Sequence, residues 1–311
     1  MDWSKPLKLW NGDDVARHFP MHGPHKITFD QVRSLSIISN YLDEIKNTTV
    51  NWFPCDTEEM WEDNKKSKLK DLKKSGWMND DGSPIEIKYH INKHGFRYDG
   101  HTDKIEPGGI LYIGDSNVFG IANHYDYNYT LQAHKQSSLK DKPYYNWGMG
   151  GRNIETYYRI LKMHIEEYKP YGVFVDFPWA SSRCDTLNSH DEFHGLILGW
   201  LIEQGVSEKI PQREFEQRVH KLFALPAVVL RWHKNMDAIK YLCYKNNAKC
   251  WIYDDPELWG DPDNSIMRNL TRCTGQWDEY RFARDLVHTN ETWHDLRGAA
   301  LAEILDYVNT K

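Results

Sequence analysis

Three residues of this chain have the types and the order needed for nucleophilic catalysis. Ser116 follows the apolar run 110–113, and Asp285 precedes His288 by three positions near the C-terminus. A serine hydroxyl becomes a good nucleophile when a histidine takes its proton and a carboxylate orients that histidine. The pattern therefore predicts Ser116 as nucleophile, His288 as general base and Asp285 as the residue that orients it.

A second histidine leaves an alternative for the base. His294 lies six positions after His288, where a helical pattern begins. It is either the base itself or a residue that supports the site, and the Asp-x-x-His spacing favours His288. Asp115, beside the serine, is expected to brace the turn by hydrogen bonds.

Glycines after the next apolar strand supply a second element of the same chemistry. Gly148, Gly150 and Gly151 follow the run 144–147. Glycine lets a backbone N–H approach a bound oxyanion closely, and such donors stabilise the charge of an acyl-transfer transition state. We expect the N–H groups of Ser116 and Gly148 to form this oxyanion hole, with Asn153 as a further polar contact.

The elements that must position these residues alternate between strand and helix from residue 107 onward. Short apolar runs predict buried strands, and periodic apolar positions predict the helices between them. The predicted strands are 110–113, 144–147, 172–176 and 249–253, and the predicted helices are 129–139, 153–168 and 225–246. This alternation predicts a parallel sheet between helices, with Ser116 at the carboxyl end of its first strand.

These motifs together resemble a known family. Gly114-Asp115-Ser116, Asn146-Trp147-Gly148 and Asp285-x-x-His288 resemble blocks I, II and V of the SGNH, or GDSL-type, hydrolases, in the same order. The resemblance covers about the last two-thirds of the chain. It implies a three-layer αβα, flavodoxin-like fold with four or five parallel strands, Ser116 as nucleophile and Gly148 as an oxyanion donor. The segment 92–97, Asn-Lys-His-Gly-Phe-Arg, also resembles one found upstream of the serine in a bacterial and phage subset. Arg97 either meets an anionic part of the substrate or braces the rim of the site, and we favour bracing.

The third block departs from the family pattern. Where the family carries Gly-x-Asn-Asp, this chain has Phe177-Pro178-Trp179-Ala180 followed by Ser181, Ser182 and Arg183. Loss of one oxyanion donor costs about a hundredfold or more in rate. Either Ser181, Ser182 or Arg183 replaces the missing asparagine, or the site is weak or silent.

Outside these motifs, the sequence predicts an N-terminal extension and an insertion within the hydrolase-like domain. Residues 1–106 form an N-terminal extension of α+β type that we expect to pack on the hydrolase-like domain, 107–311. This extension contains a predicted helix at 29–45 and a charged helix that starts at Asp56, with Glu59 completing a capping box. It also contains a predicted strand at 85–91, where apolar and polar residues alternate. Residues 185–224 are predicted to form a helical insertion, which is either a lid or substrate wall, or a segment that simply packs against the core.

Composition narrows the class of function. The formal net charge of −6 argues against a general nucleic-acid binder. The chain has 13 Trp and 18 Tyr, which is enough to fill the core and still line a substrate groove with aromatic rings. Five cysteines without a CxxC pair predict free thiols in a reducing compartment, and the N-terminus lacks a signal-like apolar run, so we expect a cytoplasmic protein without a membrane partner. No metal, nucleotide or other cofactor motif is present in the sequence.

The sequence as a whole predicts a serine esterase of SGNH type that hydrolyses a short-chain acyl ester, with O-acetyl groups on a carbohydrate as one candidate. An acyltransferase using the same site is an alternative. So is a catalytically silent module that binds carbohydrate or protein. The sequence predicts neither the acyl group, nor the alcohol, nor the oligomeric state.

Overall fold

The computed structural model describes residues 46–53, 56–101, 103–150, 152–176, 183–187, 193–197, 225–252, 283–286 and 288–310. All of them belong to one compact unit, Ile37–Lys311. For 183–187, 193–197, 225–229 and 308 the backbone alone is described. The helix predicted at 29–45 and the candidate residues Ser181 and Ser182 lie outside the described residues.

A four-stranded parallel sheet forms the centre of the fold. Its strand order is β5 (Tyr144–Gly148), β4 (Ile110–Gly114), β6 (Gly172–Val175) and β9 (Lys249–Ile252). The register pairs Gly114 with Gly148 and Ile113 with Val175, so the carboxyl ends of these three strands meet at one edge. This order places the first strand in the interior of the sheet and confirms the predicted flavodoxin-like topology.

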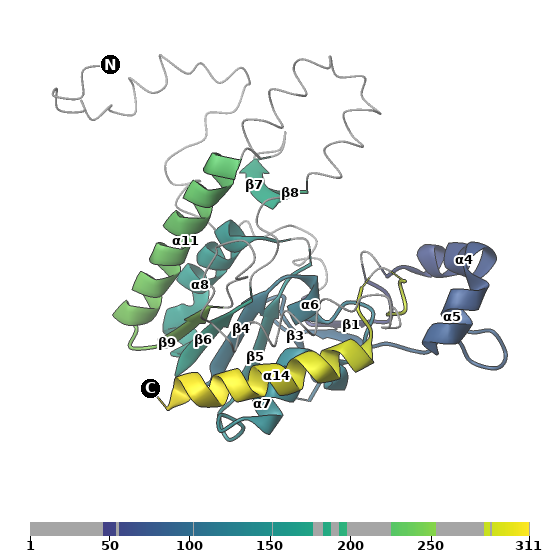
Figure 1. Ribbon diagram of the computed structural model, residues 1–311, viewed down its shortest axis with the longest axis horizontal. Coiled ribbons are helices and arrows are strands. Elements are labelled where there is room, and N and C mark those ends of the chain that lie inside the picture. Colours follow the sequence, from purple (N-terminus) through teal and green to yellow (C-terminus); the bar gives the residue numbers. More distant parts are fainter. Residues whose placement is uncertain are drawn as a thin grey trace, which may run out of the picture. The chain divides into compact units, whose positions relative to one another are not determined.

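Helices cover both faces of this sheet (Figure 1). On one face α8 (Ile154–Tyr168) packs beside α11 (Leu225–Lys245). On the other, α7 (Tyr129–Gln136) packs beside α14 (Glu291–Asn309). Alternate residues of the strands face the two layers, and the resulting cores confirm the three-layer αβα prediction. The first core includes Leu111, Ile113, Trp147, Ile160, Val173, Trp232 and Ile239; the second includes Ile110, Tyr112, Tyr129, Phe174, Trp293, Leu301 and Leu305.

Residues 46–98 add an antiparallel sheet and two short helices. The sheet has the order β1 (Thr48–Val50), β2 (Tyr89–Ile91) and β3 (Arg97–Tyr98), and α4 (Glu58–Ser67) and α5 (Leu69–Ser75) lie between β1 and β2 in the chain. A third apolar core joins this region to residues that flank the serine and the histidine. Its members are Phe53, Trp61, Leu72, Trp77, Ile87, Tyr89, Ile91, Phe119, Ile121, Ala122, Ala283 and Leu286.

Three local predictions differ from the structure. Helix α4 is capped by Thr57, whose side chain accepts a hydrogen bond from Met60 N at 3.1 Å, so Asp56 is not its cap. The strand expected at 85–91 is confined to β2. In the first part of the predicted helical insertion, Arg183–Leu187 (β7) and Phe193–Ile197 (β8) instead form an antiparallel pair in which Asp185 faces Gly195. The rest of that insertion, 188–192 and 198–224, lies outside the described residues.

The structure bears on the predictions about the cysteines and about the membrane. Cys243 and Cys250 are free thiols, as the cysteine pattern predicted for the chain. Within the described part of the chain, no helix is both long enough and apolar enough to cross a membrane.

Candidate active site

The serine lies in a tight turn between β4 and a short helix. Helix α6 (Ser116–Phe119) begins at Ser116, and Asp115 caps it by accepting a hydrogen bond from Asn117 N at 2.9 Å. The exposed fraction of Ser116 is 6%. At Gly114 a Cβ would come within 2.2 Å of Val118 Cγ2, so the turn needs glycine at the point where the strand meets the helix. Asp115 therefore braces the turn, as predicted.

The loop before α14 holds the aspartate and the histidine together. The Asp285 carboxylate contacts His288 twice, accepting a hydrogen bond from its backbone N at 3.0 Å and pairing with its ring Nδ1. The Asp285 side chain is fully buried, and the His288 side chain is 16% exposed. This arrangement fixes the orientation of the imidazole ring and directs its Nε2 away from the carboxylate.

Contacts between neighbouring residues bring the serine turn and the histidine loop together. Thr289 Oγ1 donates to Asn117 Oδ1 at 3.4 Å. Asn123 Nδ2 donates to Thr289 O at 2.9 Å, and Arg284 N donates to Ala122 O at 3.2 Å. The residues that follow Ser116 and those that flank His288 thus form one connected structure at the carboxyl edge of the sheet.

Each of these two loops contains a non-glycine residue with left-handed backbone. Leu286, between Asp285 and His288, has φ 56°, and Ala122, after α6, has φ 59°. Such conformations cost about 1–3 kcal/mol each and persist where the surroundings enforce them, often at functional sites. Here both side chains are buried in the third core. Packing against residues 46–98 therefore holds the strained loops in place.

Gly148 differs from its predicted role. Its backbone N–H donates to Asn146 Oδ1 at 2.8 Å, so this group is already engaged and is not offered to a bound oxyanion. A Cβ at Gly148 would also lie 2.1 Å from Phe119 N, which shows that the glycine is needed for close packing of β5 against α6. Gly150 lies nearer the serine, since its Cβ position would be 4.0 Å from Ser116 Cβ. Its N–H donates no hydrogen bond to another described residue.

Three further residues were predicted to contact the substrate. Asn153 has a structural role, and the side chains of Ser181 and Arg183 are not described. Asn153 caps α8, its Oδ1 accepting from Glu155 N at 2.8 Å and Thr156 N at 3.3 Å. This capping role explains its burial without a substrate. Ser181 lies outside the described residues, and Arg183 begins β7 with its side chain undescribed.

His294 has a structural role that competes with a role as base. Its Nδ1 accepts a hydrogen bond from Tyr129 N at 3.0 Å, at the start of α7. The ring is almost completely buried, and this burial, with Arg297 and His288 nearby, lowers the pKa of His294 to about 3. The ring of His294 already accepts a hydrogen bond from a backbone N–H, and its low pKa makes it a weak base. It is therefore poorly suited to take a proton from the serine.

A buried ion pair joins the extension to the histidine loop. Arg284, directly before Asp285, donates to Asp56 through Nε at 3.0 Å and Nη2 at 2.6 Å, and to the carbonyl of Asn51 at 2.8 Å. Asp56 also accepts a hydrogen bond from Tyr89 Oη. In addition, Asn64 Nδ2 donates to the carbonyl of Asp285 itself at 3.2 Å. Local sequence predicts a capping role for Asp56 and does not reveal this contact, because nothing near Asp56 in the sequence marks a partner so distant.

A second buried arginine braces the segment after the serine helix. Arg97 donates through Nη1 to the carbonyl of Phe119 at 3.2 Å and to that of Gly120, and through Nη2 to Asn123 O at 2.9 Å. Its guanidinium also lies 4.5 Å from the centre of the Tyr89 ring. Arg97 therefore has the bracing role that its motif predicted.

A third network lies where β6 ends. Asp176 accepts hydrogen bonds from Tyr129 Oη at 2.7 Å and Arg297 Nη2 at 2.6 Å. A Cβ on Gly114 would lie 3.0 Å from Asp176 Cβ, so this carboxylate adjoins the end of the serine strand. Burial raises the pKa of the Tyr129 hydroxyl, which keeps it protonated as a donor. The network links α7 and α14 to the edge of the sheet that carries the site.

A cavity of about 350 Å³ lies elsewhere, between β3, β5 and residues 125–135. Aromatic side chains make up much of its wall, with Arg97 and several charged residues. Ser116, Asp285 and His288 are absent from its lining. It is therefore distinct from the serine site.

Comparison with known proteins gives loose similarity to solved esterases. No family model matches the chain, and no curated protein sequence matches it. A lipolytic protein of the G-D-S-L family from Desulfitobacterium hafniense DCB-2 shares 13% identity over 63% of this chain and 99% of its own, with a TM-score of 0.28. A lipase/acylhydrolase from Enterococcus faecalis shares 14% identity over 65% of this chain and 96% of its own, with a TM-score of 0.31. A two-domain esterase active on acetylated mannans shares 15% over 67% of this chain, which spans 51% of that protein, with a TM-score of 0.33.

Proposed function

We propose that this protein is a serine hydrolase of SGNH type that cleaves a short-chain acyl ester. The observation that carries the proposal is the pair formed by Asp285 and His288 beside the turn that begins with Ser116. The chain neighbours of the pair hold it there, since Thr289 donates a hydrogen bond to Asn117 and Arg284 donates one to Ala122. A serine, a histidine and a buried carboxylate on adjoining loops at the carboxyl edge of a parallel sheet are the groups that acyl transfer requires.

In the proposed mechanism Ser116 Oγ attacks the carbonyl carbon of the ester while His288 Nε2 takes its proton. Asp285, fixed on Nδ1, holds the ring in the tautomer that can accept at Nε2 and stabilises the imidazolium that forms. His288 then donates the proton to the departing alcohol. A water molecule, activated by the same histidine, hydrolyses the acyl-serine and restores the enzyme.

The oxyanion donors in this proposal are the backbone N–H groups of Ser116 and Gly150. Ser116 N is the first N–H of α6, and the first N–H groups of a helix have no partner within it. Gly150 replaces Gly148 because the Gly148 N–H is bound to Asn146. Two donors aimed at the developing charge are sufficient for a hole of the usual kind.

For the substrate we propose an acetyl or similarly short acyl ester on a carbohydrate. The support is the aromatic richness of the chain, since Trp and Tyr rings stack against sugar faces while offering a polar group. Transfer of the acyl group to a sugar hydroxyl in place of water would use the same residues.

A fluorophosphonate probe tests the proposal, because it reacts with serines that a base has activated. We expect intact-mass labelling of the wild type at one site, and no labelling of the Ser116→Ala and His288→Ala variants. Ser138→Ala and His101→Ala are matched controls, because both residues are exposed and lie outside the site, and they should label like the wild type. A folded wild type that does not react would refute the hydrolase.

One specific observation favours a second function, a silent binding module. The engaged N–H of Gly148 removes a donor that the resemblance implied, in a chain that also lacks the asparagine of block III. If the probe fails, titration with acetylated and plain oligosaccharides, followed by tryptophan fluorescence, tests for binding without turnover.

A further inference from the structure

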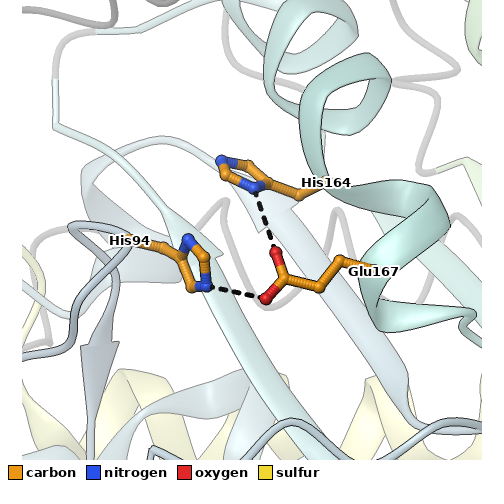
Figure 2. A group of neighbouring side chains, drawn as sticks. All are labelled: His94, His164 and Glu167. Carbon is orange, nitrogen blue, oxygen red and sulfur yellow. Dashed lines mark ion pairs between the residues drawn. The ribbon is translucent and has the colours of Figure 1, made fainter.

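Two histidines and a glutamate converge at a place that the proposed chemistry does not use. His94 lies in the turn between β2 and β3, whereas His164 and Glu167 lie one turn apart near the end of α8. The nitrogen and oxygen atoms that these side chains offer all lie within 4.8 Å of one another. Figure 2 shows both rings directed at the Glu167 carboxylate.

We propose that His94, His164 and Glu167 form a binding site for a divalent transition-metal ion, with zinc as the best match to the donors. His94 Nε2 lies 3.3 Å from Glu167 Oε1, and His164 Nδ1 lies 3.9 Å from Glu167 Oε2. Zinc bonds of about 2.0–2.2 Å to nitrogen and oxygen bring tetrahedral ligands to roughly 3.3 Å from one another. The three side chains need only small rotations to reach that spacing.

The burial of both imidazole rings favours metal binding. The side chain of His94 is 16% exposed and that of His164 is 14% exposed, so few water molecules compete with an ion for their nitrogens. His94 Nε2 is removed from solvent and makes no well-aligned hydrogen bond within the described part of the chain. A metal ion would satisfy that atom.

The surroundings fix two of the ligands and leave a position open. Asn92 Oδ1 accepts hydrogen bonds from the backbone N of His94 and of Phe96, each at 3.0 Å, which holds the turn in shape. The His164 ring packs at 5.8 Å from the Trp147 ring, giving one apolar wall. Glu167 is 44% exposed, so water can complete the coordination.

A lysine competes with the metal for the same carboxylate. Lys93 Nζ lies 3.8 Å from Glu167 Oε1, with Lys46 also close enough to act on both histidines. Both partners in the Lys93 pair are about half exposed, and exposed ion pairs contribute little to stability. The Lys93 side chain is therefore free to swing into solvent when a dication binds.

The site lies away from the proposed catalytic serine. Helix α8 ends shortly before β6 begins, so its last turn lies at the edge of the sheet where the strands start. Ser116 lies at the opposite edge, after the end of β4. The ion would fasten the β2 to β3 turn onto α8, joining the extension to the main domain on the side away from the serine.

Isothermal titration of the chelator-treated full chain with zinc chloride tests the proposal. We expect saturable binding of one ion per chain and a melting temperature that rises with zinc concentration, because an ion that binds only the folded state stabilises it. Co²⁺ in the same site should give the visible absorption of a tetrahedral nitrogen and oxygen complex.

Variants then locate the ion. Glu167→Gln and His164→Ala should weaken binding by more than the roughly 10- to 100-fold that loss of an outer-shell partner costs. His101→Ala, which removes an exposed histidine, should bind as the wild type does. Glu167→Gln alters an exposed side chain, so it serves as the ligand variant if His164→Ala does not fold. Absence of saturable binding overturns the site, and so does unchanged binding by the ligand variants, which would place the ion elsewhere, for example at Cys243 and Cys250.

Discussion

At the scale of single residues, the carboxylate of Asp285 has two tasks on one histidine. It binds the backbone N–H of His288 and its ring Nδ1 together. The first contact shapes the loop, and the second selects the tautomer. Asparagine in its place would keep a side chain of the same size but would present an N–H or a neutral oxygen to the ring.

We therefore expect Asp285→Asn to fold and to lower kcat by about 10³- to 10⁴-fold with little change in KM, because the imidazole takes the wrong tautomer. Hydrolysis of p-nitrophenyl acetate measures both constants. Asp295→Asn is the control, since Asp295 is an exposed residue of α14. An Asp285→Asn enzyme that retains a tenth of the wild-type kcat would exclude this role for the carboxylate.

Two neighbouring glycines should respond differently to alanine. In Gly148→Ala the new Cβ would lie 2.1 Å from the backbone of Phe119, which cannot move without shifting α6, so we expect a large loss of stability. In Gly150→Ala the nearest atom, at 2.8 Å, is Cδ1 of Ile121, the end of a flexible side chain. This variant should fold and lose activity because the methyl group points toward the serine. Denaturant unfolding and kcat separate the two effects, and equal stability of the two variants would contradict the packing seen at Gly148.

The residues of the candidate site were predictable to the extent that short motifs carry them. Ser116 follows a buried strand, and Asp285 and His288 lie three positions apart, so local sequence marks all three. The partner of Asp56 is 228 positions away, and no periodicity connects it to Arg284. Gly148 was assigned from its motif, but its N–H is taken by the side chain of Asn146, a contact that spacing alone does not reveal.

At the scale of elements, the helices and strands of the αβα layers were predicted within a few residues because each has a clear apolar period. The pair β7 and β8 was not, since a run such as Leu196-Ile197 fits a strand and a helix equally well. The extension was also harder to predict. Its strands are two or three residues long and are stabilised by contacts with the rest of the chain.

Two contacts join the extension to the histidine loop, one between Asp56 and Arg284 and one from Asn64 to the carbonyl of Asp285. We call these contacts the bridge, and we expect their loss to affect both stability and catalysis. Asp56→Asn would leave the Arg284 guanidinium buried without a charged partner, and we expect the free energy of unfolding to fall by about 3–5 kcal/mol. Asn64→Ala removes one hydrogen bond to the Asp285 carbonyl, which costs about 1 kcal/mol. It should lower kcat more than it raises KM, because it loosens the loop that holds His288.

Asn79→Ala is the matched control, because Asn79 binds Ser83 and Pro84 in an exposed turn far along the chain from the loop. Urea unfolding and steady-state kinetics on these three variants test the bridge. If Asn64→Ala and Asn79→Ala have the same kcat, residues 46–98 contribute stability without positioning the site.

At the scale of the whole molecule, buried histidines set how stability depends on pH. Burial lowers the pKa of His294 to about 3 and that of His164 to about 4, whereas the unfolded chain binds these protons near pH 6.5. The unfolded state therefore holds more protons than the folded state between those values. Stability is full above pH 6.5 and falls as the pH decreases toward 4 and then 3, by about 1.4 kcal/mol per pH unit for each histidine.

His124 has the opposite sign and partly offsets this loss. Its hydrogen bond to Glu291 raises its pKa, so its contribution is present at low pH and disappears as the pH rises through the folded-state value. Urea unfolding in metal-free buffer at pH 7, 6 and 5 measures the net slope. His294→Gln should flatten it by about one proton, and an unchanged slope in that variant would mean that His294 titrates normally in the folded protein.

The ion pair between Asp56 and Arg284 joins two parts of the chain that a single backbone cut would separate. A cut among the exposed residues 99–101 would leave Asp56, Asn64 and Arg97 on one piece and the serine, aspartate and histidine on the other. The second piece would contain every reacting group but lack the buried partners that hold both loops. Ester hydrolysis would then depend on reassociation of the pieces, so the two fragments, each fused to one of a pair of interacting proteins, would act as a split-enzyme reporter of that encounter.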